Sequence, residues 1–183
     1  MFIMIVKKFG DKEIAIRPVM ARDLKASEKF QDFINSLVEE DAMILICTKR
    51  TKKEELTWVK EILEDMKKGQ KVGLIAEYNS QIIGKTSITL GKERESHVGR
   101  FGLAIKNGYR GMGLGKFLMA EIIKLAQKRW GKKIKMIRLS VHQGNKPAFN
   151  LYKKMGFKQV AVIPNQVQYK GKLIDELIML KYL

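Results

Sequence analysis

The feature that most constrains the fold of this chain is a cluster of glycines between two patterned segments. Four glycines fall within the eight residues from Gly108 to Gly115. A strand pattern ends just before them, near Lys106, and an amphipathic helix pattern follows at once. Glycine lets the backbone turn closely around a ligand, and the free N–H groups of a helix start attract anions. The stretch predicts a strand–turn–helix unit that binds a phosphate group.

Two common phosphate-binding loops are excluded by counting residues. A P-loop would need glycine where Arg110 stands and a magnesium-binding hydroxyl where Phe117 stands. The two frames of a dinucleotide-binding loop meet Lys116 or Leu118 at their third glycine. The phosphate therefore belongs to another kind of ligand.

Hydrophobic periodicity predicts a single domain over residues 1–183 of mixed α/β class, with helices on the faces of a sheet. The capping-box pattern from Thr51 to Glu54 marks one helix start, and Pro147 marks another. The expected order is a hairpin, two helices, three strands, a helix, a strand, a helix and two strands. The ranges are 2–9, 13–19, 22–38, 51–68, 71–78, 81–90, 97–106, a helix after the glycines, 134–142, 147–155, 157–163 and 172–183.

The glycine cluster contains the pattern Arg110-x-x-Gly113-x-Gly115, between a strand and a helix. This pattern resembles motif A of the GNAT family of N-acetyltransferases, [QR]-x-x-G-x-[GA]. In that family the glycine turn and the helix start hold the pyrophosphate of acetyl-CoA. The resemblance implies the same anion here.

A second motif lies one strand further along the chain. Asn145-x-x-Ala148-x-x-Leu151-Tyr152 is followed by Gly156-Phe157, and this run resembles motif B of the same family. The two motifs occur in the family's order, at its spacing, and on the expected elements. The resemblance extends from about residue 15 to residue 179.

The resemblance implies a fold and a reaction. The GNAT fold is a twisted, mostly antiparallel sheet with helices on both faces and a splayed central strand pair. Its members transfer an acetyl group from acetyl-CoA directly to a primary amine, without a covalent enzyme intermediate. We therefore expect an acyltransferase with acetyl-CoA as its cofactor and CoA as a product, and no metal ion.

Motif by motif, the resemblance also assigns roles to residues. Tyr152 matches the tyrosine that protonates the departing CoA thiolate, and Asn145 matches an asparagine that contacts the pantetheine arm. Backbone groups of the strand before the glycines would bond the pantetheine amides and polarise the thioester carbonyl. The expected cofactor-binding set is Leu103, Ala104, Ile105, Arg110, Gly111, Met112, Gly113, Leu114, Gly115, Lys116, Asn145 and Tyr152.

The general base is the point where this chain departs from the family. One branch carries a glutamate on the strand before motif A, but here the equivalent position holds Gly99 or Arg100. His97 is on the same predicted strand and is the candidate catalytic base, with a strand-edge histidine as the alternative. Further candidates are Glu93, Glu95 and His142.

The acceptor is predicted from weaker signals. The pattern Gly171-x-x-x-Asp175-x-x-x-Met179 resembles the ending of small-molecule and N-terminal amine acetylators, which favours a free amino acid or similar amine. Protein N-terminal or lysine acetylation is the alternative. The net charge of +17 would attract anions and disfavours polyamines as substrates. A lysine-rich surface is also typical of thermophile proteins. The sequence contains no nucleic-acid-binding motif, so we do not expect nucleic-acid binding to be the primary role.

The cysteine count and the hydropathy of the chain bear on its location in the cell. One cysteine, Cys47, rules out an internal disulfide and fits a reducing cytoplasm. No run of about eighteen apolar residues occurs, so we expect no membrane span, and the apolar start of the chain is too short for a signal peptide. The sequence leaves open whether two copies of the chain form a homodimer.

Overall fold

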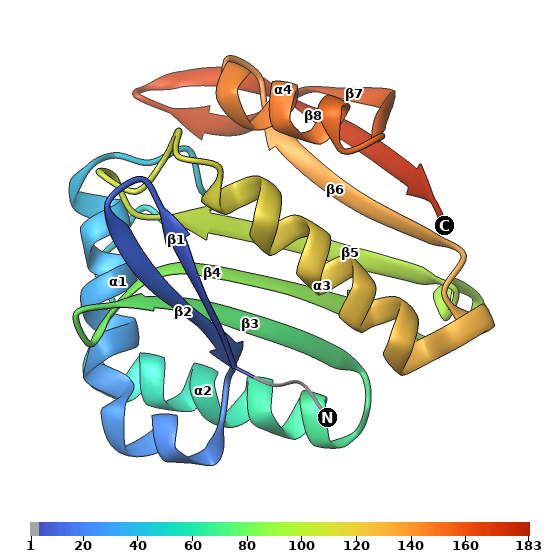
Figure 1. Cartoon of the computed structure of the whole chain (residues 1–183). Helices are drawn as coiled ribbons and strands as arrows, with labels where there is room; N and C mark the ends of the chain where they lie inside the picture. The colour runs from blue at the N-terminus through green and yellow to red at the C-terminus, as the bar shows by residue number, and fades with distance from the viewer. Residues whose placement is uncertain (1–3) are drawn as a thin grey trace.

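The computed structural model describes residues 4–183, which form one eight-stranded sheet with four α-helices (Figure 1). The predicted order of elements is confirmed, although the expected beginning of the first strand, before residue 4, lies outside the described residues. The elements are β1 (Ile5–Phe9), β2 (Lys12–Pro18), η1 (Ala21–Ala26), α1 (Ser27–Glu39), α2 (Lys52–Lys67), β3 (Lys71–Tyr78), β4 (Gln81–Leu90), η2 (Glu93–Glu95), β5 (Val98–Ile105), α3 (Leu114–Trp130), η3 (Gly131–Lys133), β6 (Met136–His142), α4 (Lys146–Lys154), β7 (Lys158–Tyr169) and β8 (Lys172–Tyr182).

The sheet confirms the predicted fold class. Its strand order is β1-β2-β3-β4-β5-β6-β8-β7, and every neighbouring pair is antiparallel except β5 and β6. The β5–β6 pair is parallel because α3 crosses over between the two strands and returns the chain to the end of the sheet at which β5 began. Figure 1 shows β6 diverging from β5 towards the end where the glycine turn lies.

Helices cover both faces of the sheet. On one face α1 and α2 pack on β3 and β4 through a core that includes Phe30, Phe33, Val59 and Ile75. On the other face α3 and α4 bury a larger cluster of side chains from β1 to β6 and from β8. The V-shaped opening between β5 and β6 can therefore be approached from two faces with different neighbours.

Local sequence signals set the helix ends as expected. Thr51 Oγ1 accepts a hydrogen bond from the Glu54 backbone N–H, and the Glu54 carboxylate accepts one from the Thr51 N–H, which completes the capping box of α2. The Asn145 side chain caps α4, with Pro147 in its first turn. The helix predicted over 22–38 begins instead as the short 3₁₀ turn η1 before α1.

A buried ionic group ties β2 to its neighbours. Arg17 donates two hydrogen bonds of 2.8 Å to Asp23 in η1 and two more, of 2.6 and 2.9 Å, to Glu77 in β3. The Arg17 and Asp23 side chains are only 6% and 4% exposed. This group joins β2, η1 and β3, away from the β5–β6 opening. Within residues 4–183 no helix combines the length and the apolar character that crossing a membrane requires.

Candidate active site

The candidate site is the opening between β5 and β6. The two strands pair only through Val98–Met136, Gly99–Ile137 and Arg100–Arg138. Beyond these pairs β5 stays with β4 as far as Ile105, whereas β6 stays with β8 as far as His142. The expected splayed strand pair is therefore present, and its inner edges have no strand partner.

The β5 edge presents alternate backbone groups to the opening. Lys106 donates its N–H to the Ile83 carbonyl, which continues the hydrogen-bonded register between β5 and β4. Because backbone direction alternates along a strand, the N–H and C=O of Ala104 also face β4, and those of Leu103 and Ile105 face the opening. Of the three residues expected to offer backbone groups, the structure directs two into the gap.

Backbone groups along β6 also alternate between those that bond β8 and those that face the opening. Gln143 donates its N–H to the Asp175 carbonyl, in register with the β6–β8 ladder. Val141 therefore bonds β8, and the backbone groups of Ser140 face the opening. Both walls thus offer hydrogen-bonding groups to a ligand that lies between the strands.

The glycine turn forms the far end of the opening. Gly111 and Gly113 have φ of +80° and +91°, a conformation that side chains rarely adopt, and an added Cβ at either position would meet no atom within 4 Å. Gly113 begins α3 without a capping side chain, and the first turn contains no acidic residue. Phe117 is the first residue to bond back, to the Gly113 carbonyl, so the preceding N–H groups remain available to an anion.

Gly115 has a different role, in packing. A Cβ at this position would lie 3.2 Å from both Ile105 Cδ1 and Leu151 Cδ2. The small residue lets the first turn of α3 approach β5 and α4 closely. Of its neighbours in the turn, Leu114 is buried, Met112 is half-buried against the core and Lys116 is exposed.

The Arg110 side chain braces the turn. Its Nε donates to the Ile105 carbonyl over 2.7 Å, and its guanidinium pairs with the Glu40 carboxylate at the end of α1. Glu40 also accepts a hydrogen bond of 3.2 Å from the Asn107 N–H. The sequence analysis missed Glu40, because the contact joins segments far apart in the chain and no local pattern signals it.

Tyr152 lies at the closed end of the opening, where β5 and β6 begin to separate. The residue is 7% exposed, and its ring packs edge-on at 6.1 Å from Phe101, the first β5 residue beyond the paired segment. Burial raises the pKa of the Tyr152 hydroxyl to about 12, so the proton is retained at neutral pH. A buried, protonated phenol is suited to donate a proton to a leaving group.

Asn145 stands where β6 leads into α4. Its Oδ1 accepts the Ala148 N–H over 3.3 Å, and its own N–H donates to the His142 carbonyl over 3.0 Å. The side-chain oxygen therefore serves as the helix cap in this structure.

The structure does not bring His97 into the opening. Its carbonyl accepts the N–H groups of Lys135 and Met136, at the end where β5 and β6 are still paired. Glu93 and Glu95 lie in η2, next to the same end, and Glu95 pairs with Arg100 over 2.5 Å. A Cβ at Gly99 would lie 2.7 Å from Ile88 Cγ2 and 2.9 Å from Ile134 Cδ1, so a larger residue there would require these side chains to move.

His142, the last residue of β6, lies at the open end. It is 6% exposed, and its Nδ1 is the one fully buried side-chain nitrogen or oxygen in residues 4–183 that has no hydrogen-bond partner. Since Val141 points into the α3 face, the His142 side chain points to the face of α1 and α2. Burial lowers its pKa and the nearby Glu176 opposes this shift, so a neutral imidazole is favoured.

The segment between α1 and α2 closes over this face. Tyr169 donates its hydroxyl to the Asp41 carbonyl over 2.9 Å, and Lys170 pairs with the Asp41 carboxylate over 3.0 Å. A Cβ at Gly144, just after His142, would lie 3.8 Å from Met43. The segment from Glu40 to Arg50, which we call the α1–α2 segment, thus connects the turn after β6 with the β7–β8 hairpin. Residues 4–183 contain no group of three or more side chains that could hold a metal ion.

Comparison with known proteins agrees with this geometry. Residues 36–157 match the model of the acetyltransferase (GNAT) family. An acetyltransferase of the GNAT family from Streptococcus pneumoniae has a similar structure, with a TM-score of 0.80 and 25% identity, covering 93% of this chain and 100% of that one.

Two curated relatives are similar in sequence. One is the L-amino acid N-acetyltransferase AaaT of Escherichia coli, 28% identical over 107 residues, or 58% of this chain and 65% of the relative. The other is an N-alpha-acetyltransferase of Sulfurisphaera tokodaii, 29% identical over 114 residues, or 55% of this chain and 65% of the relative. The chain thus matches slightly less than two thirds of the length of each.

Proposed function

Because the chain belongs to the GNAT acetyltransferase family, we propose that it is an N-acetyltransferase that moves an acetyl group from acetyl-CoA directly to a primary amine. The observation that supports this most is the opening between β5 and β6, whose free backbone edges lead to an uncapped, non-acidic helix start. Such a site offers hydrogen bonds to amides at one end and binds a polyanion at the other.

The donor half of the site would work through the backbone. The N–H groups of Leu114, Gly115 and Lys116, at the start of α3, would bind the pyrophosphate. The Leu103 backbone and the Ile105 N–H would hold the pantetheine amides, since the Ile105 carbonyl already accepts from Arg110, and a β5 N–H would polarise the thioester carbonyl. Acetyl-CoA supplies the activated acetyl thioester on which these groups act.

The acid and the base would lie on opposite faces of the opening. His142, on the α1–α2 face, takes the proton that the amine loses as it attacks the carbonyl carbon, directly or through a water molecule. Tyr152, on the α3–α4 face, gives its proton to the sulfur as the C–S bond breaks. The products are an acetamide and the CoA thiol. His97 has no part in this scheme, because it lies beside the paired end of the strands.

The acceptor that we favour is a small amine such as a free amino acid. The contacts of Asp41 with Tyr169 and Lys170 hold the α1–α2 segment beside the β7–β8 hairpin, and a segment held there would limit the room for a folded protein. The amino acid N-acetyltransferase among the relatives supports this choice. A protein N-terminus is the second candidate, supported by the N-alpha-acetyltransferase relative, because a flexible end could pass under the segment. We place the reaction in the cytoplasm, with a nucleic-acid-binding role ranked below both candidates.

A release assay for the CoA thiol tests the proposal. Purified protein is incubated with acetyl-CoA and, in separate reactions, with amino acids, polyamines and peptides with free N-termini. Thiol release that depends on the amine, with an acetylated product detected by mass spectrometry, is the expected result. Binding of the protein to immobilised DNA through moderate salt, with no transfer to any amine, would contradict it.

A further inference from the structure

The positive charge of the chain is concentrated in one part of the sequence. Residues 101–160 contain fourteen lysines and arginines but a single acidic residue, Glu121, and so hold an excess of thirteen positive charges out of the net charge of +17. Residues 21–70, which include α1 and α2, contain ten lysines and arginines and eleven acidic residues. A charge asymmetry of this kind between parts of a chain indicates a polyanionic partner.

The structure places eight of these cations on one surface. α3 and α4 lie on the same face of the sheet, and the first turn of α3 approaches α4 where Gly115 meets Leu151 (Figure 1). Every lysine of α3, η3 and α4 is exposed. These residues form what we call the α3–α4 basic surface: Lys116, Lys124, Lys128, Lys132, Lys133, Lys146, Lys153 and Lys154.

On α3 the lysines form a stripe along the solvent side. Lys116, Lys124 and Lys128 are separated by eight and four residues, which places them on one side of a helix with about 3.6 residues per turn. With a rise of about 1.5 Å per residue, the stripe is about 18 Å long, and η3 follows it with two more lysines. Each strand of a nucleic-acid duplex carries one phosphate per about 3.4 Å of axis, so the stripe can lie beside about five phosphates.

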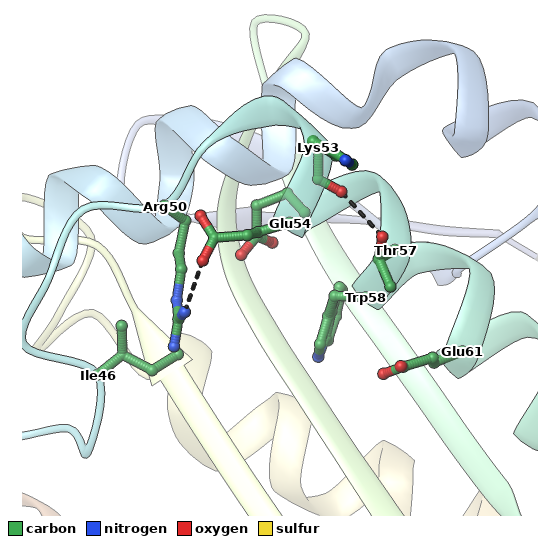
Figure 2. Close-up of a pocket in the computed structure, with 8 residues that line it drawn as sticks. Ile46, Arg50, Lys53, Glu54, Thr57, Trp58 and Glu61 are labelled. Carbon is green, nitrogen blue, oxygen red and sulfur yellow. Dashed lines mark hydrogen bonds and ion pairs between the residues drawn. The ribbon is translucent and has the colours of Figure 1, made fainter.

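The cations of this surface are not neutralised by neighbouring carboxylates. Across the described part of the chain, only Lys124 of the eight forms an ion pair, with Glu121 over 2.8 Å. The α1–α2 face differs, because four ion pairs join its charges to one another. Figure 2 shows one of them at the start of α2, where Arg50 pairs with Glu54 over 3.0 Å. A surface adapted to high temperature carries both signs in such networks, and the α3–α4 basic surface does not.

The chemistry of this surface favours a phosphate backbone over a membrane or a protein. Among the described residues, the large apolar side chains that are exposed all lie outside α3, η3 and α4. A helix that binds at a membrane surface presents apolar residues beside its cations, and the centre of a protein interface is rich in aromatic side chains. The lysines also have no exposed aromatic ring between them on which unpaired bases could stack, so a duplex fits better than a single strand.

We infer that the α3–α4 basic surface binds double-stranded nucleic acid through its phosphate backbone, independently of base sequence. The lysine ammonium groups displace counterions from the phosphates, and the release of these ions drives binding. The surface begins beside the turn where we place the pyrophosphate, but its α3 stripe continues about 18 Å along the helix. Duplex binding is therefore a further function, which does not depend on acetyl transfer.

Fluorescence anisotropy with labelled duplexes of about 20 base pairs tests the inference, with DNA and RNA in separate arms. The variant Lys128→Gln/Lys132→Gln/Lys133→Gln removes three charges at the end of α3 that lies farthest from the cofactor turn. Between about 50 and 200 mM salt, it should lower the slope of log affinity against log salt by about two to three. At about 100 mM salt its affinity should fall at least about tenfold, while its affinity for acetyl-CoA stays the same.

The matched control removes the same charge from the other face. Lys53→Gln/Lys60→Gln/Lys67→Gln changes three exposed lysines of α2, none of which forms an ion pair within residues 4–183. Charges on the far side of the protein are screened over a distance of about 10 Å at about 100 mM salt, so this variant should bind the duplex within about twofold of the natural protein. Thermal unfolding shows whether each variant is folded, and Lys153→Gln/Lys154→Gln on α4 provides a second, independent loss of affinity.

Each outcome supports or overturns the inference. Binding to DNA, to RNA or to both, with the loss confined to variants of the α3–α4 basic surface, supports it and identifies the duplex. Equal losses in the α3 and α2 variants would show that net charge alone governs binding. No binding to either duplex at about 100 mM salt, or binding only to phosphatidylserine vesicles, would also overturn it. Weaker acetyl-CoA binding with unchanged duplex binding would mean that these lysines attract the cofactor instead. Amine-dependent CoA release from a protein that binds no duplex would leave the proposed function intact.

Discussion

The carboxylate of Glu40 binds the guanidinium of Arg110 across seventy positions of sequence, and so joins the end of α1 to the glycine turn. The next residue, Asp41, contacts Tyr169 and Lys170 of the β7–β8 hairpin. Two consecutive residues therefore connect the proposed donor side of the site with the proposed acceptor side.

Glu40→Gln should loosen the glycine turn, because the amide cannot replace the charged contact with Arg110. We expect acetyl-CoA to bind about fivefold more weakly, in the range of a partly exposed ion pair, while kcat changes little. Glu39→Gln, which affects only an exposed pair with Lys49, is the control. Equal calorimetric affinities of the two variants for acetyl-CoA would show that Glu40 does not brace the glycine turn.

Gly113→Glu should prevent cofactor binding. The residue has φ of +91°, and its missing Cβ faces open space where we place the pyrophosphate. A carboxylate there brings like charges together, which costs several kcal/mol, so affinity should fall at least about a hundredfold. Gly10→Glu carries the same strain at φ of +62° in the β1–β2 turn and should bind normally. Unchanged affinity in Gly113→Glu would argue against the pyrophosphate assignment.

Tyr152→Phe should lower kcat by about a hundredfold without weakening acetyl-CoA binding, because the ring stays packed on Phe101 and only the proton donor is lost. With a pKa of about 12, the hydroxyl should cause no loss of activity until the pH approaches that value. Tyr182→Phe, at a side chain that is 70% exposed, is the control. Full turnover in Tyr152→Phe would exclude Tyr152 as the acid.

His142→Asn should lower kcat/KM by about ten- to a hundredfold at neutral pH and remove the acid limb of the pH profile. His97→Asn changes the other of the two histidines and should leave both unaltered. If His97→Asn loses the acid limb instead, the base predicted from the sequence is the correct one.

The same histidine should affect stability. Burial lowers its pKa in the folded protein below the ordinary value of 6.5, so the unfolded chain binds the proton more tightly. The contribution of His142 is therefore complete above about pH 6.5 and is lost as the pH falls from there towards the folded pKa. Urea unfolding between pH 7.5 and 5 should show a smaller loss in His142→Asn than in the natural protein.

Arg17→Ala should destabilise the fold without changing cofactor affinity. Removing the guanidinium leaves the carboxylates of Asp23 and Glu77 without their buried partner, and such losses cost about 3–5 kcal/mol. Asp11→Asn breaks an exposed pair with Lys12 and should leave the urea midpoint unchanged. Equal midpoints in the two variants would show that the buried group contributes no more than a surface pair.

Sequence reasoning succeeded where the signals are local. The capping box at Thr51, the proline in the first turn of α4 and the glycine turn before α3 are each set by a few adjacent residues. It also predicted the order of helices and strands along the chain, because the hydrophobic patterns of the two kinds of element differ.

Sequence reasoning had no signal where strand register decides. The point at which β5 leaves β6 places His97 at the paired end and Ala104 towards β4, and no local pattern encodes that point. The strand expected over 157–163 extends to Tyr169, because register shifts between Ile163 and Val167 let β7 continue beyond Pro164. Partners such as Glu40 and Arg110 meet only after the chain has folded.

The short parallel ladder between β5 and β6 has a mechanical consequence. Only three residue pairs join the backbone of the first five strands to that of the last three. A ligand bound between the strands would form hydrogen bonds to both edges and so connect β5 with β6 where the two strands are not paired. Its binding energy would add to the free energy of unfolding, and the melting temperature of the protein would rise with the concentration of CoA esters around it.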